Sequence, residues 1–146
     1  MENQRVILFL NRLLANYFVL FIKTYRYQWF TKGTNTLTIK EQYRNIQHSL
    51  QLDIEQIAKH ILYLNGKPFA TMVKFIKQAS LEEAEADDTI AEISNQTIND
   101  CRKIIREIEE EGIPLAKKTN DLYTIHFLLD RQTTIISVMN DMSMIN

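Results

Sequence analysis

The sequence predicts an all-α protein, built as one bundle of four long helices with a short extra helix in the connection between the second and the third. Its 146 residues include only three glycines and two prolines, too few for a turn-rich β fold. Four long stretches repeat apolar residues at spacings of three, four and seven, as a helix that buries one side requires. The length fits a sizeable core, so we expect a single domain over residues 1–146.

The first helix is expected over residues 3 to 30. The stretch is apolar enough to be mistaken for a signal sequence or a membrane span. Asn11, Arg12 and Asn16 interrupt it, and no small-residue cleavage site follows, which favours a buried bundle helix. Its expected core positions are Ile7, Leu10, Leu14, Phe18, Phe21, Ile22 and Tyr25.

The second helix is expected over residues 38 to 65, running antiparallel to the first after a short turn around Gly33. Thr38 and Glu41 have the spacing of a capping box, which marks its start. Gly66 and Pro68 follow its end. Its expected apolar face is Ile39, Tyr43, Ile46, Leu50, Ile57, Ile61 and Leu64.

The same helix carries a second line of side chains, about a third of a turn from the apolar face. Every member of this line, which we call the polar stripe, is polar or charged. We expect function, or its loss, to be recorded there. The polar stripe consists of Lys40, Arg44, His48, Gln51, Glu55 and Lys59.

The connection to the third helix is too long for a simple hairpin. Residues 70 to 79 predict a short helix inside it, and such a crossover lets the second and third helices run parallel. Ser80 and Glu83 have the spacing of a second capping box. The acidic run EEAEADD that follows Leu81 is interpreted as a solvated helix entry, with a cation site as the alternative.

The third helix is expected over residues 87 to about 111, and Gly112 and Pro114 then disturb it. Cys101 lies on its apolar side, which favours an inert core thiol over a nucleophile. Residues 119 to 121 are expected to cap the fourth helix. The core positions of the third helix are Ile90, Ile93, Thr97, Ile98, Cys101, Ile104, Ile105 and Ile108; those of the fourth are Leu122, Ile125, Leu128, Leu129, Ile135, Ile136, Met139 and Met142.

Several functional classes find no support. The formal charge is −1, with 17 basic and 18 acidic residues, so no overall field attracts nucleic acid. A single cysteine excludes an internal disulfide and fits a reducing cytoplasm. Glu-x-x-His pairs, phosphate-binding glycine loops, Cys-x-x-Cys and Gly-x-Ser-x-Gly are absent from the sequence. His126 and Asp130 share a helix face, which we interpret as a surface hydrogen bond rather than a metal site.

Five segments strongly resemble the Dps family, the ferritin-like DNA-binding proteins from starved cells. They are YQWFTKG (residues 27–33), LTIKE (37–41), IAKHIL (57–62), NGKPFATM (65–72) and TND (119–121). The resemblance implies a ferritin-like four-helix subunit in a hollow shell of twelve, built from two-fold dimers. It also implies iron oxidation at sites that two subunits share across a two-fold axis, with the iron mineral stored inside.

The ligand positions of this shared site depart from the family. The resemblance implies a His before the tryptophan, where Gln28 stands, then a second His and an Asp, where Lys40 and Arg44 stand. The partner subunit would supply an Asp and a Glu, where Glu55 and Lys59 stand. Only Glu55 keeps a side chain that binds such cations strongly.

Electrostatics strengthens this interpretation. A lysine about 7 Å from a divalent ion costs roughly 5 kcal/mol at an effective dielectric of about 20. Lys40, Arg44 and Lys59 facing one carboxylate would therefore repel Fe²⁺. We interpret the polar stripe as an intersubunit salt-bridge patch, with Glu55 pairing across the two-fold axis. We thus expect weak or absent ferroxidase activity and no metal at this position.

Two other family features are weak. The termini MENQRV and MSMIN carry one basic residue between them, so DNA binding is not expected. The family's three-fold iron-entry pore is acidic, whereas here Asp121 has Lys117 and Lys118 as neighbours. We therefore expect a cytoplasmic iron-homeostasis or stress-response shell that is inert or co-assembles with an active homologue. The alternatives are a non-metal helical scaffold and an active ferroxidase that uses other ligands.

Overall fold

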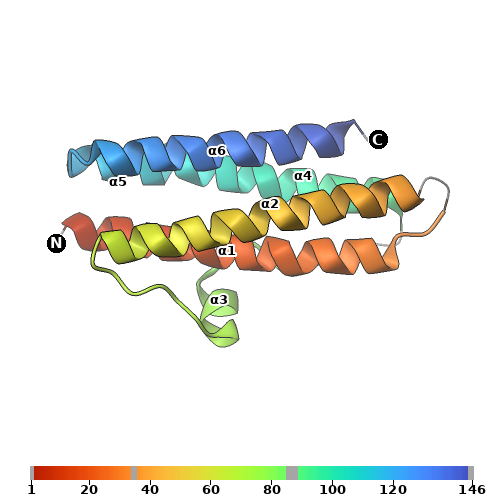
Figure 1. Cartoon of the computed structure of the whole chain (residues 1–146), viewed down its shortest axis with the longest axis horizontal. Coiled ribbons are helices and arrows are strands. Elements are labelled where there is room, and N and C mark those ends of the chain that lie inside the picture. Colours follow the sequence, from red (N-terminus) through yellow and green to blue (C-terminus); the bar gives the residue numbers. More distant parts are fainter. Residues whose placement is uncertain (1, 34–35, 85–88, 145–146) are drawn as a thin grey trace.

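The computed structural model describes residues 2–33, 36–84 and 89–144, and the side chain of Glu2 is not described. Its long helices lie side by side as a bundle, and one short helix lies outside it (Figure 1). The helices are α1 (Glu2–Phe30), α2 (Thr36–Tyr63), α3 (Met72–Gln78), α4 (Ile90–Glu107), the π-helix η1 (Ile108–Gly112), α5 (Ile113–Lys118) and α6 (Leu122–Ser143). The predicted count of four long helices and one short connecting helix is confirmed, because η1 and α5 prolong α4.

The order of the helices around the bundle follows from the lengths of their connections. α1 packs against α2 and α4, and α6 packs against α4 and α2, so α2 and α4 lie diagonally opposite. A short turn makes α1 and α2 antiparallel, whereas the long connection lets α2 and α4 run parallel (Figure 1). The predicted topology is therefore confirmed.

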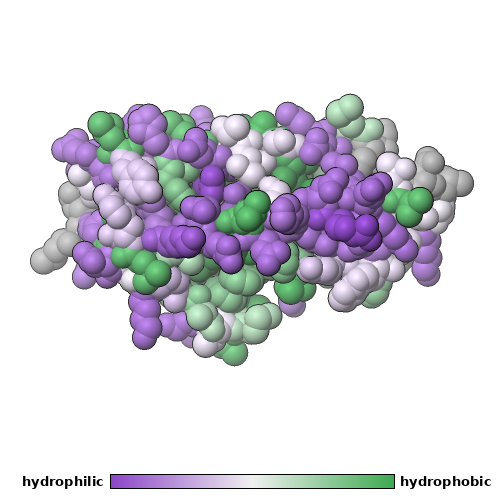
Figure 2. Space-filling view, viewed as in Figure 1, coloured by the Kyte–Doolittle hydropathy of each residue, from purple (hydrophilic) through white to green (hydrophobic). Residues whose placement is uncertain are grey.

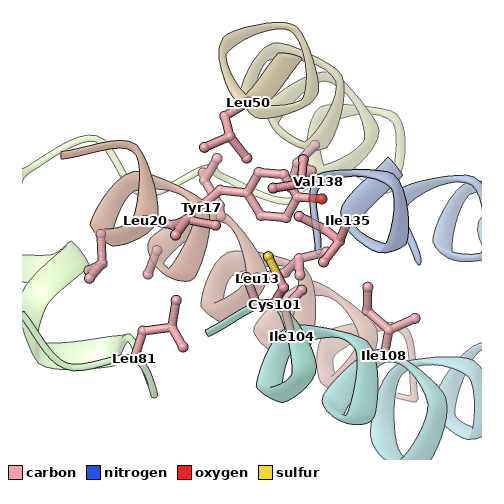
Figure 3. Packing of buried hydrophobic residues seen from close by; sticks show 14 of the residues in the cluster. Leu13, Tyr17, Leu20, Leu50, Leu81, Cys101, Ile104, Ile108, Ile135 and Val138 are labelled. Carbon is pink, nitrogen blue, oxygen red and sulfur yellow. The ribbon is translucent and has the colours of Figure 1, made fainter. Parts of the chain in front are cut away.

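The core runs the length of the bundle between the four long helices. Figure 3 shows Tyr17, Leu50, Cys101 and Ile135 meeting there from α1, α2, α4 and α6. All seven residues of the predicted apolar face of α2 are buried. The predicted core side of α4 is confirmed as well, with Ile93, Thr97, Ile98, Cys101, Ile104 and Ile108 buried.

The predicted core positions of α1 and α6 are only partly correct. Ile22 is 50% exposed and Leu122 is 68% exposed, and Leu129 and Ile136 are also exposed. α1 is apolar on two sides, and only one of them faces the bundle axis. The predictions of Leu10 and Leu14 are confirmed, and the buried side also includes Val6, Phe9, Leu13, Tyr17, Leu20 and Tyr27.

Two polar residues of α1 hold the connection that carries α3. The Asn11 side chain accepts a hydrogen bond from the Phe69 amide at 2.9 Å and donates one to the Lys67 carbonyl at 3.1 Å. Asn16 accepts from the backbone amides of Ser80, at 2.8 Å, and of Leu81. The two asparagines that interrupt the apolar pattern of α1 are thus anchors for the connection.

Both predicted capping boxes are wrong. α2 begins at Thr36, so Thr38 lies inside its first turn. Ser80 lies in the connection, where its hydroxyl donates to the Glu107 carboxylate at 2.9 Å. α4 is instead capped by Thr89, whose side-chain oxygen accepts from the Glu92 amide at 3.1 Å. The predicted start of the third helix at 87 lies outside the described residues, as do residues 85 to 88 of the acidic run that begins at Glu82.

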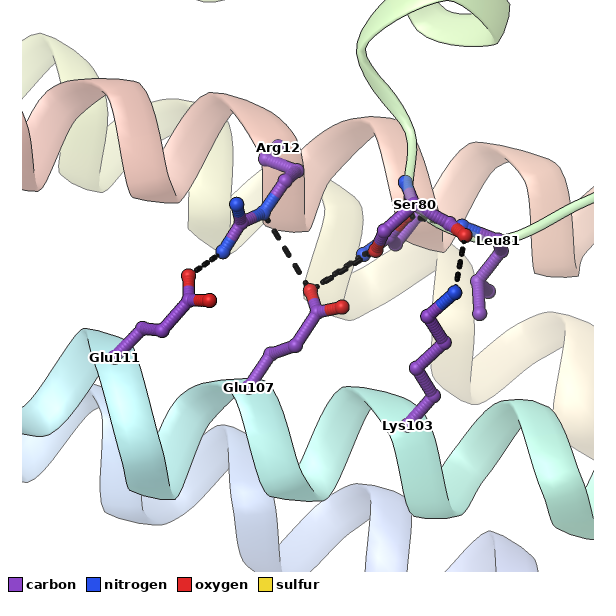
Figure 4. A network of polar contacts seen from close by, with 7 residues as sticks. Arg12, Ser80, Leu81, Lys103, Glu107 and Glu111 are labelled. Carbon is purple, nitrogen blue, oxygen red and sulfur yellow. Dashed lines mark hydrogen bonds and ion pairs between the residues drawn. The ribbon is translucent and has the colours of Figure 1, made fainter.

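The predicted disturbance at Gly112 and Pro114 is confirmed, but it does not end the helical path. The backbone widens into the π-turn η1 just before Pro114, which has no backbone N–H to donate. Gly112 is required for contact with α1, because a Cβ there would lie 2.5 Å from the Phe9 ring. Beside this contact Arg12 forms ion pairs with Glu107 and Glu111 (Figure 4).

One helix is long and apolar enough to span a membrane by length and composition, over Asn3–Phe30. Within its most apolar window, 67% of the residues are buried inside the bundle. The same test is passed by the core helices of proteins that never enter a membrane. The observed packing of α1 therefore agrees with the predicted bundle helix.

Candidate functional site

The polar stripe lies along the outward side of α2, away from the core. Arg44, Glu55 and Lys59 are exposed, and Lys40 is half-buried. In Figure 2 hydrophilic residues form a band across the face of the molecule over α2. Within the part of the chain that the structure describes, none of these four side chains forms an ion pair or hydrogen bond. Their charges are therefore available to a partner.

Gln28, which stands where the resemblance implies a histidine, is held by a second amide. Its side-chain oxygen accepts a hydrogen bond of 2.8 Å from the side-chain nitrogen of Gln47, a buried residue of α2. This bond joins the end of α1 to α2. Sequence analysis missed Gln47, because it lies between the apolar face and the polar stripe.

One chain does not bring the five altered ligand positions together. Lys40 and Glu55 are 15 residues apart on one straight helix, which corresponds to about 22 Å along its axis. Gln28 and Lys40 lie at one end of this span and Lys59 at the other. Among the described residues, no group of three or more His, Cys, Asp or Glu side chains is arranged to hold a metal ion. Any site built from all five positions needs a second subunit.

The centre of the bundle holds a buried ion pair that sequence analysis missed. Asp53 of α2 lies 3.1 Å from the guanidinium of Arg131 on α6, and the Tyr17 hydroxyl lies 3.5 Å from the same carboxylate. Burial raises the pKa of Asp53, and the charge of Arg131 opposes this shift. Burial also raises the pKa of Tyr17. A charged residue on an apolar face has no sequence signal that identifies its partner.

The region of the expected three-fold pore has its own hydrogen-bond network. Asp121 caps α6, and its carboxylate accepts from the amide and the hydroxyl of Thr124. The Thr124 oxygen lies 2.8 Å from Nε2 of His60, a buried residue of α2 that stacks on Phe127. Burial lowers the pKa of His60, and Asp121 opposes that shift. Asp121 is thus engaged within its own chain.

An apolar groove of about 460 Å³ lies between α1 and α3. Trp29, 69% exposed, and Ile76 are among the exposed apolar residues along it. In Figure 2 the pale green surface over α3 borders the hydrophilic band over α2. Exposed apolar surface of this kind is common where proteins contact other molecules. The groove is lined by Phe18, Val19, Ile22, Trp29, Phe30, Met72, Phe75 and Ile76, with Lys23, Tyr25, Arg26, Glu83 and Ala84.

Comparison with known proteins gives consistent matches. A family model described as a ferritin-like domain matches residues 7–143. The chain is 32% identical to general stress protein 20U of Bacillus subtilis, with 87% of each chain covered. It is 29% identical to DNA protection during starvation protein 2 of Bacillus anthracis, covering 91% of this chain and 90% of that one.

The fold also matches solved structures. The Dps protein from Bacillus brevis superposes with a TM-score of 0.93 at 24% identity, covering 99% of this chain and 96% of that one. Because the identity is below a quarter, this likeness supports the fold alone. The family match over residues 7–143 and the 32% identity to general stress protein 20U show that the chain belongs to the ferritin-like family, in which its relatives include Dps proteins and general stress proteins.

Proposed function

We propose that this chain is a subunit of a hollow Dps-type shell in which the iron-oxidation site shared between subunits has been lost. The observation that carries the proposal is the charge of the polar stripe. Lys40, Arg44 and Lys59 occupy ligand positions of the family site, and Glu55 is the one carboxylate that remains. Such a set is short of the anionic and imidazole ligands that iron requires.

The exposure of the stripe adds to this argument. Since Lys40, Arg44 and Lys59 form no ion pair within the described chain, Glu55 is the one stripe carboxylate that opposes their repulsion of Fe²⁺. Ion pairs between Glu55 and the cations of a neighbouring subunit would then replace the metal as the link between the two.

The proposed assembly is a shell of twelve subunits built from two-fold dimers, located in the cytoplasm. The proposal is supported by two accessible surfaces that a neighbouring subunit could cover. They are the apolar groove between α1 and α3 and the polar stripe of α2, whose charges form no ion pair within the described chain. Contact with DNA is not part of the proposal. The formal charge of −1 gives little counterion release on a polyanion.

Iron oxidation tests the proposal directly. The natural protein is compared with a variant carrying Gln28→His, Lys40→His, Arg44→Asp and Lys59→Glu, which restores the family's ligand types. Aerobic Fe²⁺ oxidation is followed by absorbance, and each protein is first matched for helicity and particle size. We expect rapid oxidation by the variant and little above the buffer rate by the natural protein. Oxidation by the natural protein as rapid as that by the restored variant would overturn the proposed loss of the site.

A further inference from the structure

The polar stripe has a spacing that reads the same in both directions. Its six positions are separated by four, four, three, four and four residues. On a helix of 3.6 residues per turn they fall within an arc of about 100°. Consider a two-fold axis beside the midpoint of the stripe, between Ser49 and Leu50, which sets the α2 of a partner antiparallel to this one. Each stripe position then lies at the same height along the helix axis as a stripe position of the partner.

The charges do not share this symmetry. If the partner is a second copy, Arg44 lies level with a glutamate, the partner's Glu55, which is favourable. His48 lies level with the partner's Gln51, which carries no charge. Lys40, however, lies level with the partner's Lys59, and this like-charged pair occurs twice in the dimer. Because neither lysine forms an ion pair within the described chain, the mismatch remains at the contact.

We propose that this face of α2 fits a homologous four-helix subunit that carries carboxylates at the levels of Lys40 and Lys59 better than it fits a second copy. The inference rests on the proposed function, from which it takes the two-fold contact. With such a partner, the two outer levels carry opposite charges and the Arg44 level keeps its pair. Leu52, half-exposed beside the stripe, and the apolar groove supply contact area that does not discriminate between partners.

The experiment uses a charge-reversed copy of this chain, Lys40→Glu with Lys59→Glu, as the acidic partner. Equal amounts of the variant and of the natural protein, uniformly labelled with ¹⁵N to separate the two chains by mass, are unfolded in urea, refolded together and diluted until any shell dissociates into dimers. Native mass spectrometry then counts the like and mixed dimers. We expect the ratio of mixed to like dimers to exceed its statistical value of about one by about fivefold or more, since mixing removes like-charged pairs at both outer levels.

A matched control places the same charge change elsewhere. Arg102→Glu with Arg106→Glu reverses two exposed cations on α4, diagonally opposite α2. Mixed with the natural protein, this control is expected to give the statistical 1:2:1 distribution. The excess from the stripe variant should also shrink as salt is raised, because exposed charges are screened.

Three results would overturn the inference: a statistical mixture with the stripe variant, an equal excess with the α4 control, or no dimer of any kind. The proposed loss of iron oxidation is separable from it. Statistical mixing together with slow iron oxidation would end only the partner inference. Selective mixing together with rapid oxidation by the natural protein would end only the proposed loss of the site.

Discussion

The carboxylate of Asp53 lies 3.1 Å from the guanidinium of Arg131, so that a buried ion pair joins α2 to α6 at the centre of the bundle. Both side chains are largely withdrawn from water, at 9% and 14% exposure. Removing one partner leaves the other charge buried without compensation, whereas replacing both leaves none. The pair therefore fixes how the two halves of the bundle meet.

Arg131→Met should destabilise the protein by about 3 to 5 kcal/mol, because Asp53 then remains charged and buried. Urea unfolding followed by circular dichroism measures the change. The double variant Asp53→Leu with Arg131→Met should recover most of the loss. A cost below about 1 kcal/mol for the single variant would show that the pair is not a structural link.

Stability should fall with acidity because of His60. Burial lowers its folded pKa below the ordinary value of about 6.5, so the unfolded chain takes up its proton first as the pH falls. The contribution of neutral His60 is full above that value and is lost as the pH falls from it through the folded pKa. Urea midpoints between about pH 5 and pH 8 should therefore slope less steeply for His60→Gln than for the natural protein. Parallel slopes would contradict this role.

Gly112→Ala should destabilise the protein by about 1 to 3 kcal/mol, because the added methyl group overlaps the Phe9 ring. A second substitution, Phe9→Leu in the same chain, removes the overlap and should restore part of the lost free energy of unfolding. If thermal unfolding shows the two substitutions to be additive, the contact between η1 and α1 is looser than the structure describes.

Cys101 should resist thiol reagents in the native protein. Its side chain is fully buried, and burial raises its pKa to about 12, so almost no thiolate exists at neutral pH. Ellman's reagent is expected to label it only after unfolding in concentrated urea. Rapid labelling of the folded protein would reveal opening of the bundle near the middle of α4.

The sequence was sufficient for the number of helices, the crossover and both faces of α2, because those depend on the spacing of apolar residues over many turns. It was insufficient for α1, where apolar residues cover two sides and periodicity does not choose between them. Asp53 and His60 were missed for a related reason. A polar residue on a core face reads as an interruption until its partner on another helix is known.

The residue types at the altered ligand positions can be read from the sequence, but the contacts that these residues make between subunits cannot. Residue types alone indicated that Lys40, Arg44 and Lys59 repel a cation. Their separation along α2 means that any encounter with Glu55 involves a second subunit. The structure of a single chain therefore shows that these side chains are accessible and form no ion pair within the described residues. Their pairing with Glu55 depends on assembly.

Asn11 and Asn16 grip the crossover at two fixed points, near Phe69 and at Ser80. The connection between these two points, which carries α3, therefore has a fixed length. An inserted residue there would displace α3 from α1 or break the hydrogen bonds of one asparagine. We therefore expect insertions and deletions among related proteins to lie after Leu81 rather than between Phe69 and Ser80.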